Sequence, residues 1–381
     1  MNILVFSPGY PDAKVSNYPF IKQLVEEWAK KGNSCTVITT NSITKNKRFV
    51  ETATAESFDG GGSVKVFRSN VLSFSKYKIL GVNLTSLFHK WGVKKALRKV
   101  KDNVDVVYCH FWQSGADGFL YTKKKRTPMI IASGESNIEL LFGDTDKSFV
   151  DFVSGVVCVS SKNMEESVRL GLTTLDKCEV FPNCVNPSLF RKLNKLECRK
   201  KLGLPENVFI VIFVGSFKES KGPLRLEQAL RNTNDNNIYS VYIGGGAQLP
   251  SPPNMLYRGQ VMHEDIPLFL NASDVFVLPT LAEGCCNAII EAMACGLPII
   301  SSDLPFNWDV LDSSNSILID PSSITQISEA IIKVKDDKSL RERLSEGALK
   351  TAQSLTIDRR ASNILSFIKK RCEKIDNKLN Y

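Results

Sequence analysis

The residues best suited to chemistry are two carboxylates, Glu283 and Glu291, which flank a predicted turn between a strand and a helix. Residues 275–278 form a short apolar run of the kind that makes a buried strand. Asn287 is a favoured N-cap residue and Gly296 a common helix terminator, so the segment between them is predicted to be a helix. The pattern therefore places one acid before the turn and the other about one turn inside the helix.

A helix over residues 287–295 would direct its free backbone N–H groups, and the positive end of its dipole, into the loop that precedes it. Such a helix start stabilises an anion, phosphate above all. Both Glu283 and Glu291 could then face one crevice. The alternative is that Glu291 only complements the helix dipole and that Glu283 is a solvated loop acid.

The string from 283 to 298 reads EGCCNAIIEAMACGLP. It resembles the E-G-x-x-N-A-x-x-E-A-M-A-x-G-x-P signature of retaining GT-B glycosyltransferases of the family-4 type, also called glycosyl transferases group 1. The resemblance implies that Glu283 contacts hydroxyls of the donor sugar and that Glu291 holds the ribose hydroxyls. It also implies that backbone groups of the intervening loop bind the donor diphosphate, at Cys285, Cys286, Asn287 and Ala288.

Residues 215–222, GSFKESKG, resemble the G-R-x-x-x-x-K-G loop of the same family. The resemblance assigns Lys221 to the donor diphosphate, where a compact positive charge is needed. Ser216 replaces the usual arginine, and Lys218 or Arg225 could supply a second charge. An exposed lysine after a glycine-rich loop is the alternative interpretation.

Further positions are implied on the donor side. The glycine run at 244–246 is not a dinucleotide fingerprint, because no GxGxxG opens a helix there. It matches the family's turn before the strand that leads to Gln260 and Val261, which are candidates to contact the base. Near the N-terminus the usual Gly-Gly pair is missing, and Gly9 remains beside the donor phosphates, with Ser16 and Asn17.

In the first half, His110 ends a predicted strand and is either a strand-end residue or part of the acceptor site. The segment TPMIIASGESNI resembles P-x-x-x-T-x-H-G-x-D-I, but Ser133 stands where the family has histidine. Glu135 and His110 are therefore the candidates to orient the acceptor or take its proton. Together with Glu283 and Lys221 they form the expected catalytic set.

The 381 residues are enough for two domains of average size. Strand and helix patterns alternate from the N-terminus, break in the Pro/Asn-rich segment 181–194, and then restart. We expect an α/β protein of GT-B type, with two Rossmann-like, doubly wound parallel-sheet domains that face a cleft. The expected limits are 1–185 for the acceptor domain, 186–357 for the donor domain, and a C-terminal helix at about 358–381 that packs back on the first domain.

The net charge is +9, and residues 76–126 alone hold twelve basic and three acidic residues. Apolar side chains, Trp91 among them, alternate with these charges, as in a segment that lies on a membrane surface. A solvated face is the alternative. Nucleic acid is not an expected partner, because no nucleic-acid-binding signature occurs. No run approaches the roughly 18 apolar residues of a membrane span, so we expect a cytoplasmic protein, at the inner face of the membrane if the basic segment binds it.

No metal or other cofactor is expected. Asp144 and Asp146 form an Asp-x-Asp pair, but they lie in a polar loop and not at a strand end. Ten cysteines show no CxxC or Cys/His cluster and are expected to be small, reduced side chains. The leaving-group charge would then be met by Lys221 and the helix start, as the resemblance to metal-independent GT-B enzymes implies.

The function expected from the resemblance is retaining transfer of a hexosyl-type sugar from a nucleotide-diphosphate sugar to a saccharide or polyprenyl-linked acceptor. The pathway would be bacterial surface polysaccharide or glycolipid biosynthesis. Two alternatives stay open: a GT-B sugar-nucleotide epimerase, and an inert nucleotide-sugar-binding module in which Ser133 and Ser216 have abolished turnover.

Overall fold

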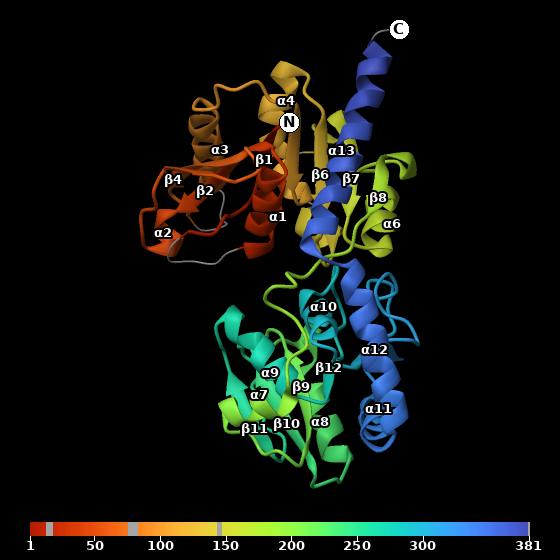
Figure 1. Cartoon of the computed structure of the whole chain (residues 1–381). Helices are drawn as coiled ribbons and strands as arrows, with labels where there is room; N and C mark the ends of the chain where they lie inside the picture. Colours follow the sequence, from red (N-terminus) through yellow and green to blue (C-terminus); the bar gives the residue numbers. More distant parts are fainter. Residues whose placement is uncertain (13–17, 75–82, 143–146, 380–381) are drawn as a thin grey trace. The chain divides into compact units, whose positions relative to one another are not determined.

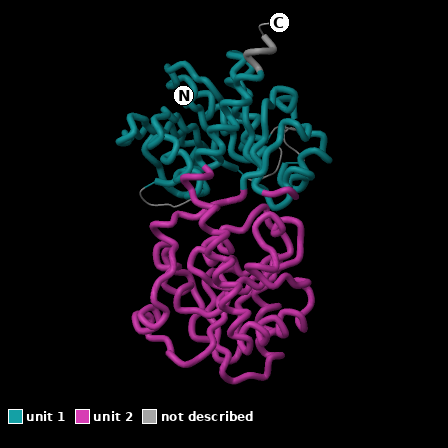
Figure 2. The backbone as a smooth tube through the Cα atoms, turned by 45° about the vertical axis from the view of Figure 1, so that its right-hand side comes forward, with its two compact units in different colours: residues 1–159, 163–181, 361–381 teal, residues 160–162, 182–360 magenta. Residues whose placement is uncertain are grey.

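A computed structural model describes residues 1–12, 18–74, 83–142 and 147–379, with side chains described up to residue 374. The chain divides into two compact units, coloured separately in Figure 2. The first unit contains residues 1–159, 163–181 and 361–381, and the second contains residues 160–162 and 182–360. Each unit has its own sheet and its own core.

The first unit is built on an eight-stranded sheet with the order β3-β4-β2-β1-β5-β6-β7-β8 (Figure 1). Its strands are β1 (Asn2–Phe6), β2 (Ser34–Ser42), β3 (Ala53–Ser57), β4 (Ser63–Val71), β5 (Val106–His110), β6 (Met129–Ser133), β7 (Val153–Cys158) and β8 (Cys178–Val180). Its helices are α1 (Pro19–Lys30), α2 (Ile43–Asn46), α3 (Leu84–Leu97), α4 (Gly115–Lys125), α5 (Ile138–Phe142), most of α6 (Ser161–Arg169), and α13 (Ile357–Leu379) from residue 361 onward.

Helices cover both faces of this sheet because successive strand residues point in opposite directions. On β5, the ring of Tyr108 packs edge-on against Trp28 of α1, with ring centroids 5.0 Å apart. The next residue, Cys109, faces Gly118 of α4 so closely that a Cβ there would lie 2.3 Å from its sulfur. The Trp28 indole also donates to the Ala361 carbonyl at 3.1 Å, which ties α1 to the C-terminal helix.

The C-terminal helix α13 packs on β7, next to the β8 edge of the same sheet. Phe367 lies against Gly155 of β7 and packs edge-on against Phe181, with ring centroids 6.0 Å apart. The Arg371 guanidinium donates to the backbone carbonyls of Ser154 at 2.6 Å and Asp176 at 3.0 Å. The helix thus closes on the unit that the first half of the chain forms.

The first sheet is parallel, as expected, except at one edge. Strand β3, which was not predicted, pairs with β4 in antiparallel register from Ala53 opposite Phe67 to Ser57 opposite Ser63. The tight connection at 58–62 allows this hairpin, since Gly61 adopts a left-handed φ of +79°. All other strand pairs of the sheet are parallel.

The second unit has a parallel six-stranded sheet with the order β11-β10-β9-β12-β13-β14. Its strands are β9 (Phe209–Val214), β10 (Ile238–Ile243), β11 (Met255–Gly259), β12 (Val275–Leu278), β13 (Ile299–Ser302) and β14 (Ser316–Ile319). Its helices are α7 (Lys195–Leu202), α8 (Pro223–Asn232), α9 (Ile266–Ala272), α10 (Asn287–Ala294), α11 (Ile324–Asp336) and α12 (Lys338–Ser354).

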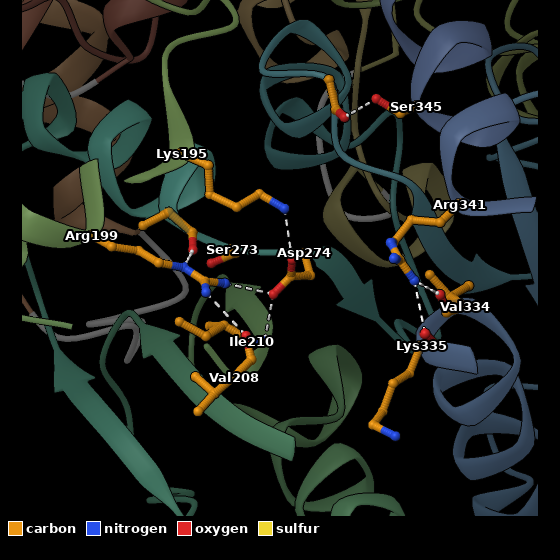
Figure 3. Close-up of polar contacts among 12 residues, drawn as sticks. Lys195, Arg199, Val208, Ile210, Ser273, Asp274, Val334, Lys335, Arg341 and Ser345 are labelled. Carbon is orange, nitrogen blue, oxygen red and sulfur yellow. Dashed lines mark hydrogen bonds and ion pairs between the residues drawn. The ribbon is translucent and has the colours of Figure 1, made fainter. Parts of the chain in front are cut away.

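A buried ion pair fixes the amino-terminal edge of this second sheet (Figure 3). Asp274, just before β12, accepts from the Arg199 guanidinium at 2.7 Å, from the Ile210 backbone N–H of β9 at 2.7 Å, and from Lys195 at 2.6 Å. Arg199 also donates to the carbonyl of Val208 at 3.0 Å. Strands β9 and β12 are therefore aligned by one carboxylate, which sets where their carboxyl ends, and the loops that follow, will lie.

Candidate active site

Two loops at the carboxyl ends of β9 and β12 meet in the second unit. The loop after β9 carries Lys221, and the loop after β12 carries Glu283, whose carboxylate accepts a hydrogen bond from the Lys221 ammonium. The Ser220 carbonyl accepts from the Leu281 backbone N–H at 2.7 Å and from the Thr280 hydroxyl at 3.0 Å. The structure thus places two of the expected catalytic residues in direct contact, each on a loop held by the other.

The ionisation of this pair is set by its surroundings. Burial works against the charge of Lys221, but the charge of the Glu283 carboxylate and its hydrogen bond raise the pKa of the lysine above its usual value. The Glu283 side chain is only 10% exposed, and Thr280 donates to it at 3.1 Å. Lys221 therefore stays positive at neutral pH, although its side chain is only 22% exposed.

Helix α10 begins one residue earlier than the N-cap prediction implied. Cys286, with φ −84° and ψ 113°, is the N-cap, and Asn287 is already helical without a capping side-chain bond. Cys286 has the extended backbone of a cap residue, and the Asn287 amide belongs to the first helical turn. The donor groups at this helix start are therefore backbone N–H groups, the arrangement that binds anions.

The two cysteines of this loop are buried and protonated. Burial raises the pKa of the Cys285 thiol to about 12 and raises that of Cys286 further. The Cys285 carbonyl accepts from the Asn183 side chain at 2.9 Å, which anchors the loop to the segment that enters the unit. Both thiols are thus small neutral side chains under the helix start.

Glu291 points to a partner that the sequence did not suggest. The imidazole of His263, just before α9, lies 3.0 Å from its carboxylate, and the Glu291 side chain is 12% exposed. The hydrogen bond with Glu291 raises the pKa of His263, and its ring packs on Phe190 with centroids 5.2 Å apart. No motif marks His263, because a histidine before a helix has many ordinary uses.

The remaining donor-side candidates surround two glycine turns. A Cβ on Gly244 would lie 1.9 Å from the Gly215 carbonyl oxygen, so the turn after β10 packs directly on the turn that carries Ser216. Gln260 lies over this contact, since a Cβ on Gly245 would meet its amide nitrogen at 2.6 Å. Val261, half-buried, follows in the same loop as His263.

Arg225, one of the cations that could supply a second charge beside Lys221, instead binds groups of the two loops. Its guanidinium donates to the Pro279 carbonyl at 2.9 Å and pairs with Glu219. Lys218 is exposed. The compact charge nearest to Glu283 is therefore Lys221.

The first-unit candidates lie at the carboxyl ends of β5 and β6. His110 is 7% exposed, and its ring lies against Phe20 and Phe111 at centroid distances of 5.3 and 4.6 Å. The Glu135 carboxylate accepts from the backbone N–H of Trp112 at 2.7 Å and from the Ser133 hydroxyl at 3.2 Å. Burial raises the pKa of Glu135 against the effect of these bonds.

Glu135 therefore ties the ends of two neighbouring strands together, and Ser133 contributes to that tie. Gly9 is half-buried, in the loop after β1. Ser16 and Asn17, and the Asp144–Asp146 pair, lie outside the described residues. Within the residues that are described, no group of three or more His, Cys, Asp or Glu side chains could hold a metal ion.

Helix α10 begins at the carboxyl edge of the second sheet, and a helix start of this kind can bind phosphate. Two α/β units, each built on a parallel sheet, define the GT-B class of protein. Two family models match the chain: "Glycosyltransferase Family 4" over residues 20–189 and "Glycosyl transferases group 1" over residues 194–351. The chain belongs to the group 1 glycosyltransferases of GT-B fold, and it is a transferase enzyme, as the sequence predicted.

Named relatives agree with this assignment. The chain is 26% identical over 277 residues to the putative teichuronic acid biosynthesis glycosyltransferase TuaC of Bacillus subtilis, covering 69% of each chain. It is 27% identical over 265 residues to the UDP-Gal:alpha-D-GlcNAc-diphosphoundecaprenol alpha-1,3-galactosyltransferase of Escherichia coli, covering 63% of this chain and 68% of that protein. Its fold matches HepE of Anabaena, solved with UDP and glucose, with a TM-score of 0.71, 16% identity, and coverage of 96% and 99%.

Proposed function

We propose that this enzyme transfers a hexosyl-type sugar, with retention of anomeric configuration, from a nucleotide-diphosphate sugar to a saccharide or lipid-linked saccharide acceptor. In this proposal residues 186–357 bind the donor, and residues 1–185 with the helix at about 358–381 bind the acceptor. The observation that carries it is the contact between Lys221 and Glu283 beside the start of α10.

The donor would use three features of that corner. The first-turn amides of α10 would hold the diphosphate. Lys221 has three N–H donors, so it would stay hydrogen-bonded to Glu283 while it also donates to a phosphate oxygen. Glu283 would accept from sugar hydroxyls, and Glu291 would accept from the ribose. Gln260 and Val261 would lie against the base.

Retention would follow from attack on the same face that the diphosphate leaves. The acceptor hydroxyl would form the new bond to the anomeric carbon, and a phosphate oxygen of the leaving group would take its proton. Lys221 and the helix start would stabilise the negative charge that builds on that leaving group. No divalent metal enters this scheme, so activity is expected to survive EDTA.

A donor screen tests the proposal. Thermal unfolding is measured with UDP-, GDP- and ADP-sugars; a ligand at 100 times its Kd should stabilise the protein by about 2.7 kcal/mol. UDP is tried first, since HepE was solved with it. Failure of every donor to shift the wild type, with an intact fold, would contradict the proposal.

Product analysis separates transfer from epimerisation. The anomeric configuration of the product is read by NMR with donor and acceptor together, and again with donor alone. A new glycosidic bond with the donor's configuration supports retaining transfer, whereas a changed sugar nucleotide without acceptor would indicate an epimerase.

Surface polysaccharide or glycolipid assembly is the proposed pathway, supported by the names of the two relatives.

An anionic membrane surface is proposed as the place of action. A groove of about 1010 Å³ between α3 and α4 is lined by the basic residues Lys90, Lys94, Arg98, Lys123, Lys124 and Lys125. Trp91 and Leu87 on α3 are 51% and 55% exposed. Residues 75–82 of the basic segment lie outside the described part of the chain. Within the described part, no helix is long and apolar enough to cross a membrane.

A further inference from the structure

A second polar site lies in the first unit, at the carboxyl edge of strands β1, β2 and β4. It is a pocket of about 780 Å³ whose lining includes Tyr10, Thr39, Asn41, Lys45, Arg68 and Asn83. Neither His110 nor Glu135, the acceptor-side candidates from the sequence, lines it. The carboxyl edge of a parallel sheet is where α/β domains bind ligands. We name it the Thr39–Arg68 pocket.

Thr39 and Arg68 are direct neighbours across the sheet. They are register partners in the parallel pair β2–β4, so their side chains leave the same face side by side. Thr39 is 4% exposed and Arg68 is 6% exposed. Both are therefore buried polar side chains that lie together in the wall of one pocket.

Each of the two carries an atom without a partner. Among the described residues, nothing hydrogen-bonds to the Thr39 hydroxyl or to the Nε–H of Arg68. The other guanidinium nitrogens donate to the Pro11 carbonyl at 2.7 Å and to the Thr54 hydroxyl at 3.4 Å, which hold the group in place. Buried polar atoms are nearly always paired, so two adjacent exceptions on residues that line one pocket mark a place for a ligand.

Arg68 makes no direct ion pair in the described part of the chain, although the negative charge of Asp12 acts on it from a greater distance. Within the described residues no carboxylate lies in ion-pair range of it. Asp12, the acid in the pocket lining, is held by the fork of Arg48, one of whose bonds is 3.0 Å long. Burial lowers the pKa of Arg68, as expected for a desolvated cation. A buried guanidinium without its own carboxylate is stabilised by an oxyanion, which it can hold through charge-assisted bonds.

We propose that the Thr39–Arg68 pocket binds a hydroxylated molecule through its carboxylate or phosphate group, and that this molecule is the sugar acceptor. Arg68 donates its Nε–H to the anionic oxygen, and the Thr39 hydroxyl adds a second bond. The anion site stands on the pocket alone, whereas its assignment to the acceptor rests on the proposed function.

Binding of three probes to the full chain tests the anion site: glucuronate, glucose 6-phosphate and the uncharged glucose, each followed by calorimetry. We expect at least one of the two anionic sugars to bind more tightly than glucose; which of them does so distinguishes a carboxylate site from a phosphate site. Arg68→Gln should weaken that binding by about tenfold or more, the usual effect of losing a charge-assisted bond. Lys65→Gln is the control, since Lys65 lies on the same strand outside the pocket and makes an exposed ion pair with Asp102.

Thr39→Val gives a second readout that a purely structural role would not produce. It removes the unpartnered hydroxyl at constant shape, so the thermal midpoint should stay or rise while anion binding falls several-fold. Thr36→Val on the same strand, outside the pocket lining, should leave binding unchanged. If Arg68→Gln does not fold, Thr39→Val decides.

Three results would overturn the proposal: no binding of either anionic sugar, equal binding of glucose, or unchanged affinity in folded Arg68→Gln and Thr39→Val. Nucleotide-sugar binding is measured on the same preparations. Loss of nucleotide binding with anion binding intact would overturn the proposed function and leave the anion site standing. Nucleotide binding without any anion binding would overturn the anion site and leave the proposed function standing.

Discussion

The contact between Lys221 and Glu283 is the centre of the proposed donor site. Lys221 is half-buried and bonded to Glu283, whereas Lys218 in the same loop is exposed. We expect Lys221→Met to lower the turnover number by roughly 10²–10³, as losing one preorganised donor to a developing oxyanion does. Lys218→Met, the matched control, should stay within a few-fold of wild type. Steady-state kinetics with the donor found in the screen would measure both, and equal effects of the two changes would contradict the role of Lys221.

His263 and Glu291 form the second pair at this scale, and it responds to pH. The bond with Glu291 raises the pKa of His263 above its ordinary value, so the protonated imidazole is favoured in the folded state. The resulting stabilisation is complete below the unfolded pKa of about 6.5 and is lost as the pH rises through the higher folded pKa. Thermal midpoints of wild type and His263→Gln, measured from about pH 5 to pH 9, should therefore differ most at the acid end. A difference that is constant across this range would show that the imidazole charge does not contribute.

At the scale of elements, the site depends on how β9 and β12 are aligned. Asp274 is 12% exposed and accepts from Arg199, whose side chain is 3% exposed, and from the β9 backbone. Asp274→Asn leaves the guanidinium without its charge partner, so we expect a loss of about 3–5 kcal/mol in the free energy of unfolding. Glu206→Gln breaks only an exposed pair with Lys200 and should cost less than about 1 kcal/mol. Urea denaturation of both variants compares them; similar midpoints would contradict the alignment role.

The elements that sequence predicts are those with strong local patterns. Strands such as β9, an unbroken apolar run, and the stop of α10 before Gly296 follow from composition and helix-ending chemistry. Strand β3 carries no such pattern, because it lies at a sheet edge and is largely exposed, and pairing with β4 alone defines it. The cap at Cys286 was missed for a related reason: backbone geometry imposed by the loop outweighs the intrinsic preference of Asn287.

The candidate site divides in the same way. Glu283 and Glu291 are predicted from sequence because their spacing is tied to one turn and one helix, and Lys221 is predicted because its loop resembles that of the family. His263, Thr39 and Arg68 are not, since their roles come from contacts between residues far apart in the chain. A buried arginine without a direct ion pair, or a histidine beside a carboxylate, is visible only once the strands are in register.

At the scale of the molecule, the excess of positive charge is concentrated on one unit. The net charge is +9, and the groove between α3 and α4 carries six basic side chains with Asp117 as the acid in its lining. Asp117 is itself bonded to His89 at 2.8 Å. Each basic side chain near an anionic bilayer contributes about 1 kcal/mol of attraction, and exposed Trp91 adds apolar contact. The first unit is therefore the part of the enzyme expected to meet the membrane.

Vesicle sedimentation tests that expectation with a charge-matched pair of variants. Replacing Lys123, Lys124 and Lys125 of α4 by Gln removes three charges from the groove, so binding to phosphatidylserine vesicles should fall by about 3 kcal/mol, roughly a hundredfold. Replacing three basic residues of the second unit, Lys200, Lys201 and Lys338, removes the same charge elsewhere and should have little effect. Added salt should abolish the difference, because exposed charges interact little beyond a Debye length, which falls from about 8 Å at 0.15 M salt to about 3 Å at 1 M. Equal losses for the two variants would mean that total charge, and not the α3–α4 groove, determines membrane attraction.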